Sequence, residues 1–102
     1  MIVSVTYPKT STLKFDHKYY VEKHLPLVQH FWGHHGLRSI KVLRGTGSMG
    51  GAAAYELVAL LDFESEQAFL GAAGAHADDV MGDIHNFSNE QPIVQFNEPV
   101  VF

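Results

Sequence analysis

Histidine is the residue type of this sequence best suited to chemistry at neutral pH. The chain has seven histidines among 102 residues and no cysteine, which excludes disulfides, thiolate metal ligands and cysteine nucleophiles. Asp16, Tyr20 and His24 follow one another at intervals of four, so a helix would place them in one row. This pattern predicts that His24 is a general acid or base, that Asp16 orients it, and that Tyr20 or the neighbouring Tyr19 donates to a developing oxyanion.

A structural interpretation of His24 fits the same spacing. A buried histidine needs only a hydrogen-bond partner, and Tyr7, Tyr19 or a carbonyl freed by Pro26 could supply one. Tyrosines likewise serve in packing more often than in catalysis. Both interpretations are open on the sequence alone. We expect the pocket around His24 to have four further ligand-binding residues: Tyr7, Leu27, Phe31 and His76.

Metal and cofactor sites have weaker support. His30 and His34 have the spacing of two ligands on one helix face, with His35 beside them, but Gly33 interrupts the helix and no third ligand follows at a diagnostic distance. We therefore expect a solvated helix end and no metal. The glycine-rich segment 45–51 lacks the Lys-Ser/Thr ending of a phosphate-binding loop and joins two predicted strands, so we expect a flexible hairpin loop and no bound nucleotide or other cofactor.

The elements that must position these residues alternate along the chain. Period-2 patterns predict strands over residues 2–7, 37–44, 54–63 and 91–95. Helical spacing predicts a helix from Asp16 to about Trp32, with a face formed by Val21, Leu25, Val28 and Trp32 and a kink near His24 caused by Pro26. A second helix is expected over 64–75, and a short helical stretch over 78–85. The order βαββαβ predicts an α+β, ferredoxin-like fold with an antiparallel sheet.

The strand at 54–63 is apolar on both faces, which predicts a homodimer. Two helices cover only one face of a four-stranded sheet, yet Val58 and Leu60 together with Ile2 would put an apolar patch on the other face. A second copy packed sheet on sheet, with the tail 100–102 reaching across, would cover this patch. The alternative is that the second helix or the tail folds over its own sheet.

Composition limits the remaining classes. A length of 102 residues with 46% hydrophobic residues predicts one domain, residues 1–102. The net charge of −4 and the scattered basic residues disfavour nucleic acid as a partner. No apolar stretch approaches the roughly 20 residues of a membrane helix, and no secretory signal is visible at Met1, so we expect no membrane association and a cytoplasmic location.

Three segments together resemble a known family. Tyr7-Pro8 closes the first predicted strand, Phe15-Asp16-x-x-Tyr19-Tyr20 opens the helix, and His24-x-Pro26-Leu27 follows. This pattern resembles the EthD family, small proteins associated with ethyl tert-butyl ether degradation, and the resemblance spans nearly the whole chain. It implies a dimeric α+β barrel, in which two ferredoxin-like protomers pack their sheets together and each keeps a pocket between sheet and helices. His24 matches the family's most recognisable polar position.

The resemblance does not select a reaction, because one fold hosts many functions. We expect either a cofactor-independent enzyme that acts on a small hydrophobic or cyclic substrate by His/Tyr acid–base chemistry, or a non-catalytic protein that binds a small ligand for an oxygenase system. The resemblance links the enzymatic alternative to ether or xenobiotic degradation.

Overall fold

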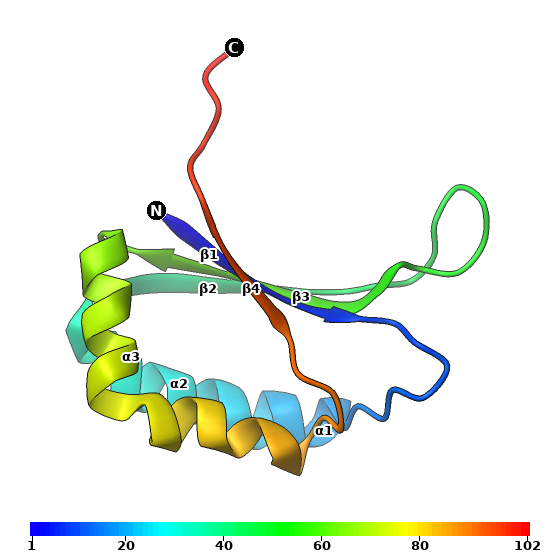
Figure 1. Ribbon diagram of the computed structural model, residues 1–102, viewed down its shortest axis with the longest axis horizontal. Helices are drawn as coiled ribbons and strands as arrows, with labels where there is room; N and C mark the ends of the chain where they lie inside the picture. Colours follow the sequence, from blue (N-terminus) through cyan, green and yellow to red (C-terminus); the bar gives the residue numbers. More distant parts are fainter.

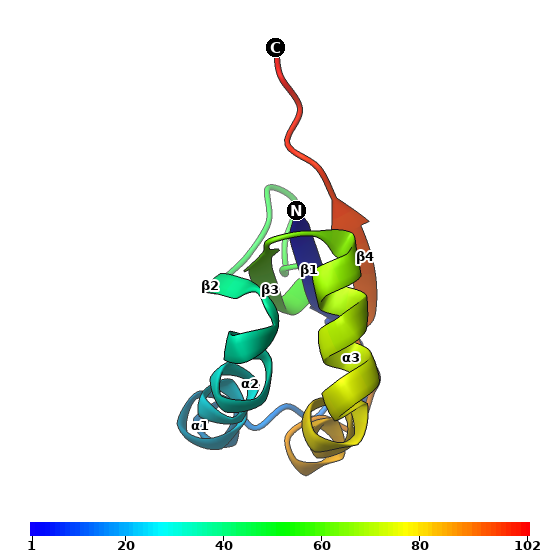
Figure 2. The same ribbon diagram turned by 90° about the vertical axis from the view of Figure 1, so that its left-hand side faces the viewer.

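The computed structural model describes residues 1–102 and shows a four-stranded antiparallel sheet with helices on one face (Figures 1 and 2). The strands are β1 (Ile2–Pro8), β2 (Leu37–Arg44), β3 (Tyr55–Phe63) and β4 (Ile93–Asn97), in the spatial order β2-β3-β1-β4. β1 pairs with both β3 and β4, which is the arrangement of a βαββαβ unit. The predicted α+β fold is confirmed, and the last strand lies two residues later than predicted.

The first helical region is continuous but not regular. It comprises α1 (His17–Tyr19), the π-helical turn η1 (Tyr20–His24), α2 (Leu25–Trp32) and the 3₁₀ turn η2 (Gly33–His35). Asp16 begins it as predicted, because its carboxylate accepts a hydrogen bond from the Tyr19 backbone N–H at 3.0 Å. Gly36 ends it with φ of 96°, a left-handed conformation that favours glycine.

The wide π-helical turn decides which residues of this helix face the sheet. The buried residues are Tyr20, His24, Val28 and Trp32, four apart throughout. In a regular α-helix each step of four residues advances about 40° beyond a full turn, so three steps would carry the row off one face. The π-helical turn over 20–24 offsets this drift. The predicted position of Val21 on the buried face was wrong, since that side chain is 59% exposed.

The second helical region consists of α3 (Glu66–Val80) and the 3₁₀ turn η3 (Met81–Asn86). Its break lies at His76, whose backbone is not helical (φ −135°, ψ 35°). Figure 1 shows the consequence: the first part of α3 runs away from the sheet, and the part after the bend runs alongside α2. This second part brings Asp83 and Ile84 beneath the sheet, where both are buried.

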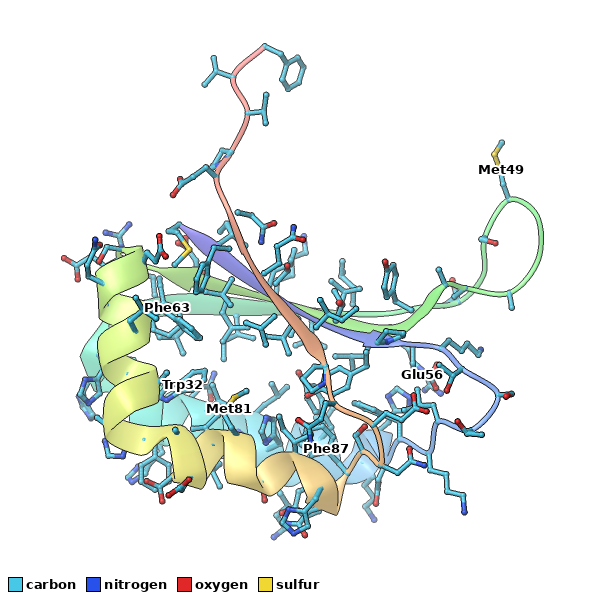
Figure 3. The ribbon with its side chains drawn as sticks, viewed as in Figure 1. Trp32, Met49, Glu56, Phe63, Met81 and Phe87 are labelled. Atoms are coloured by element: carbon cyan, nitrogen blue, oxygen red, sulfur yellow. The ribbon has the colours of Figure 1, made fainter.

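The core fills the layer between the sheet and the helices. From the sheet it receives alternate residues of β1 and β3, among them Val3, Tyr7, Leu57 and Leu61. Figure 3 shows Trp32, Phe63, Met81 and Phe87 in this layer. No helix of the structure combines the length and the apolar character needed to span a bilayer.

The opposite face of the sheet has no helix over it. The strand register places Ile2, Leu43, Val58, Leu60 and Ile93 on this face, because they alternate with the core residues along their strands. Leu43 is 45% and Ile93 53% exposed. After β4 the chain continues away from the helices, and the side chains of residues 100–102 are almost fully exposed (Figures 1 and 2).

Candidate functional site

A small cavity beside His24 lies between the sheet and α2. It measures about 30 Å³, and all of its lining residues except His24 are hydrophobic or aromatic. They are Val5, Tyr7, Tyr20, His24, Leu25, Val28, Trp32, Ile40, Ala59, Leu61, Val80, Met81 and Ile84. This volume is enough for one or two water molecules, so a larger molecule requires the lining to move. Met81 is the most exposed residue of this set, at 37%, and its thioether side chain is flexible.

His24 is held by a carboxylate from the other helical region. Its Nδ1 atom lies 3.0 Å from Oδ2 of Asp83, and both residues are buried. Tyr19 donates to Oδ1 of Asp83 from its hydroxyl at 2.7 Å, and Asn86 donates from Nδ2 at 2.9 Å. Asp83 therefore accepts three hydrogen bonds, an arrangement that favours its ionised form.

The charges of this pair follow from its surroundings. Burial lowers the pKa of His24, and the hydrogen bond and charge of Asp83 only partly oppose this effect. Burial alone would raise the pKa of Asp83, but the hydrogen bonds from Asn86, Tyr19 and His24 outweigh it and hold that pKa below the ordinary 3.8. At neutral pH the pair is thus a neutral imidazole beside a carboxylate. Because the carboxylate can only accept, we assign the imidazole proton to Nδ1.

The other ring nitrogen of His24 is consequently a free base. The protein provides no hydrogen-bond partner for Nε2, since the only hydrogen bond of the ring is the one to Asp83. The ring is fixed from the sides by Phe87, with centroids 4.5 Å apart, and by Tyr20, which stacks at 5.4 Å. A neutral imidazole with one nitrogen bound to a carboxylate and the other free is the arrangement of a general base.

Tyr7 and Tyr20 bring two hydroxyl groups to the lining of the same cavity. Both residues line the cavity, and the protein provides neither hydroxyl with a hydrogen bond. Burial raises the pKa of both phenols well above the ordinary 10.0, and for Tyr7 the charge of Tyr20 adds to the effect. Both therefore stay protonated and can donate to an oxygen that becomes negative in the cavity.

The structure corrects several of the predicted roles. Asp16 is exposed and caps the helix, and the carboxylate beside His24 is that of Asp83. Tyr19 contacts the pair from outside, through Asp83, and does not line the cavity. Leu27 and Phe31 lie beside the buried row of the helix and not in it, so neither reaches the cavity.

His76 also lies outside the cavity. It occupies the bend of α3, where its ring is 5.0 Å from Phe31 and 5.3 Å from His35 and its Nδ1 is 3.1 Å from Asp79. His35 and His76 thus approach each other, but the structure contains no group of three or more potential metal ligands.

A wider hollow of about 360 Å³ lies at the start of the first helix but is not a pocket of the same kind. It is a polar surface groove, and its side chains already hold the adjoining loop. Asn89 accepts from the backbone N–H of Lys14 at 2.7 Å and donates to the carbonyl of Thr12 at 2.9 Å, while Asp16 caps the helix. The cavity at His24 is therefore the candidate site.

The chain is similar to an EthD-like protein from Ralstonia eutropha JMP134, with 30% sequence identity and a TM-score of 0.89 over 98% of this chain and 91% of that one. The chain belongs to the EthD family. An EthD family protein from Bacillus halodurans C-125 has the same fold, with a TM-score of 0.64 and 19% identity over 95% of this chain and 97% of that one. No family model and no curated protein matches the sequence.

Membership in the EthD family confirms the resemblance seen in the motifs around Tyr7, Asp16 and His24. Asp83 was missed because it lies far from His24 in the sequence, next to neither the helix nor the motif. The one available signal was its place in the helical segment 78–85. Val80 and Ile84 have the spacing of one helix face, and Asp83 lies three residues after Val80 and directly before Ile84.

Proposed function

We propose that this EthD family protein acts on a small, mainly apolar molecule by acid–base chemistry without a cofactor. The observation that carries the proposal is the buried His24, which lines an apolar cavity, has Nδ1 held by Asp83 at 3.0 Å and has no hydrogen bond at Nε2. In the proposed step Nε2 removes a proton from carbon next to a carbonyl group. The electron pair of the C–H bond moves to the carbonyl oxygen, which accepts a hydrogen bond from Tyr20 or Tyr7, and return of the proton completes an isomerisation or exchange.

Asp83 would stabilise the imidazolium formed in this step. Its carboxylate is ionised, contacts Nδ1, and is itself fixed by Tyr19 and Asn86. A positioned base of this kind contributes about 10²- to 10⁴-fold to a rate. The name of the EthD family supports ether or xenobiotic degradation as the setting of the reaction.

Exchange of the α-protons of cyclopentanone for deuterium, followed by proton NMR in D₂O, tests the proposal without knowledge of the natural substrate. We expect protein-dependent exchange that His24→Gln reduces by at least about 100-fold. His17→Gln is the matched control, because His17 also contacts a carboxylate, that of Glu56 at 3.2 Å, but does not line the cavity. Equal loss in both variants, or no loss in His24→Gln, would refute the role of His24.

The second candidate function is binding without turnover, in which the protein holds a small hydrophobic ligand for an oxygenase system. The apolar lining of the cavity favours this candidate, since His24 is its only residue that is neither aliphatic nor aromatic hydrophobic. Saturable binding of cyclopentanone with no exchange above the His24→Gln background would favour binding over catalysis.

A homodimer is part of the proposal. The uncovered sheet face has an apolar strip formed by Leu43, Val58 and Leu60, with Ile93 on the far side of Thr6, and the exposed tail 100–102 extends on the same side of the sheet (Figure 1). Exposed apolar patches of this kind mark protein contacts, and a second copy can bury both the strip and the tail. Light scattering after size exclusion should give twice 11.3 kDa for the unsubstituted chain, and Leu60→Lys should shift it to the monomer. A monomer at micromolar concentration before substitution contradicts the dimer.

A further inference from the structure

Trp32 presents a buried hydrogen-bond donor that the protein leaves unpaired. The residue is 3% exposed, and its Nε1 is fully shielded from solvent and has no hydrogen-bond partner in the structure. Two core rings fix the indole edge-on, Phe63 with centroids at 6.0 Å and Phe69 at 5.6 Å. A buried tryptophan N–H normally has a partner, because leaving it unpaired costs stability. The position of Trp32 therefore needs an explanation beyond packing.

The cavity at His24 is the place from which a partner could come. The structure has three hollows, and Trp32 lines only this one. Figure 3 shows Trp32 in the layer between sheet and helices, on the same side of the sheet as Met81. Met81, at 37% the most exposed residue of the lining, and Trp32 line the same cavity, so a molecule that occupies the cavity lies beside the indole.

We infer that the natural ligand of this cavity is a small neutral molecule with a carbonyl or ether oxygen that accepts a hydrogen bond from Nε1 of Trp32. The inference rests on the proposed function, because it requires that the cavity takes a ligand. An acceptor is specified since the indole N–H can only donate. A neutral molecule is specified because no Lys, Arg, Asp or Glu lines the cavity, and a charge buried there would be unpaired.

Trp32 also makes the inference measurable, because the chain has one tryptophan and therefore one indole N–H signal. The probes are cyclopentanone and methylenecyclopentane, which have the same shape but differ in whether an oxygen or a CH₂ group is attached to the ring. Proton–nitrogen spectra for the indole and proton–carbon spectra for the methyl groups are recorded with each probe on the unsubstituted chain and on Met81→Ala, which removes the partly exposed side chain of the lining. The methyl signals of Val80 and Ile84 report entry of either probe, since both residues line the cavity.

We expect both probes to shift the methyl signals and only cyclopentanone to move the indole proton downfield, as hydrogen bonding does. We also expect Trp32→Phe to weaken cyclopentanone binding about fivefold relative to methylenecyclopentane, the size of one net hydrogen bond. Both probes are measured on the unsubstituted chain and on Trp32→Phe, so the effect of replacing the indole by a smaller ring, which both probes share, cancels. The indole signal of the unsubstituted chain gives the answer even if Trp32→Phe does not fold.

Two results would overturn the inference, and they have different consequences for the proposed function. If cyclopentanone shifts the methyl signals but moves the indole proton no more than methylenecyclopentane does, the cavity takes a ligand and Trp32 does not bind its oxygen. A buried water that already accepts from the indole N–H and stays in place would give this same result. If neither probe shifts the methyl signals, even in Met81→Ala, the cavity takes no small molecule and the proposed function fails together with the inference.

Discussion

Replacement of Asp83 by alanine removes the acceptor that three side chains share. The Asp83 carboxylate accepts hydrogen bonds from the hydroxyl of Tyr19 at 2.7 Å, from Nδ2 of Asn86 at 2.9 Å and from Nδ1 of His24 at 3.0 Å. Tyr19 and Asn86 can turn to water, but His24 is only 6% exposed and its N–H would lose its partner. A hydrogen bond to a charged group contributes about 1.5–3 kcal/mol, so we expect the free energy of unfolding to fall by about 2 kcal/mol. For a domain of this size the midpoint of thermal unfolding should fall by about 10 °C.

The assay is urea and thermal unfolding of Asp83→Ala beside a matched control, Asp79→Ala. The control removes a pair of the same chemistry, because Nδ1 of His76 lies 3.1 Å from Oδ2 of Asp79, but the Asp79 side chain is 47% exposed. An exposed pair contributes about 0–1 kcal/mol. We expect Asp83→Ala to lower the free energy of unfolding by at least about 1 kcal/mol more than Asp79→Ala does. Equal decreases in the two variants would refute the importance of burial for the His24–Asp83 pair.

Three further predictions concern pH and packing. Because burial lowers the pKa of His24 below 6.5, the unfolded chain binds a proton at this histidine more tightly than the folded protein does. The free energy of unfolding should therefore fall as pH decreases below 6.5, by at most about 1.4 kcal/mol per pH unit. In urea titrations at several pH values, His24→Gln should lose this dependence on pH. Phe87→Ala should cost about 3–5 kcal/mol, since Phe87 is 2% exposed and contacts the His24 ring at 4.5 Å; a cost under about 1 kcal/mol in urea unfolding would contradict this packing. Gly36→Ala should lower the free energy of unfolding by at least about 1 kcal/mol, because φ is 96° and the new methyl group would lie 2.9 Å from Cβ of Ala68. The control is Gly33→Ala, whose methyl group meets no atom within 4 Å and should leave the protein equally or more stable in thermal unfolding.

Sequence patterns could predict the fold because strands and helix caps have local causes. The alternation in residues 2–7 and 54–63 reflects one buried face, and Asp16 begins the helix through a contact three residues away. The apolar second face of the strand at 54–63 follows from the same alternation. These features need no knowledge of what lies across the core.

The site could be predicted only in part, because its contacts join distant segments. The motif leads to His24, but the carboxylate that holds it comes from a turn 59 residues later, which the bend at His76 brings back under the sheet. The π-helical turn at 20–24 gives no clear signal in the pattern, so the sequence predicts Leu27 and Phe31 at the pocket of His24, whereas Val28 and Trp32 line it. Helical periodicity assumes 3.6 residues per turn, and one wider turn is enough to exchange neighbouring rows.

The most direct test of the central claim is a proton–nitrogen NMR titration of the His24 ring in the unsubstituted chain, using long-range couplings that distinguish Nδ1 from Nε2. We expect a neutral ring at pH 7 with its proton on Nδ1 and none on Nε2, and a pKa below the ordinary 6.5. A proton on Nε2 at neutral pH, or a pKa above 6.5, would contradict the account, because His24 would then offer the cavity no free base.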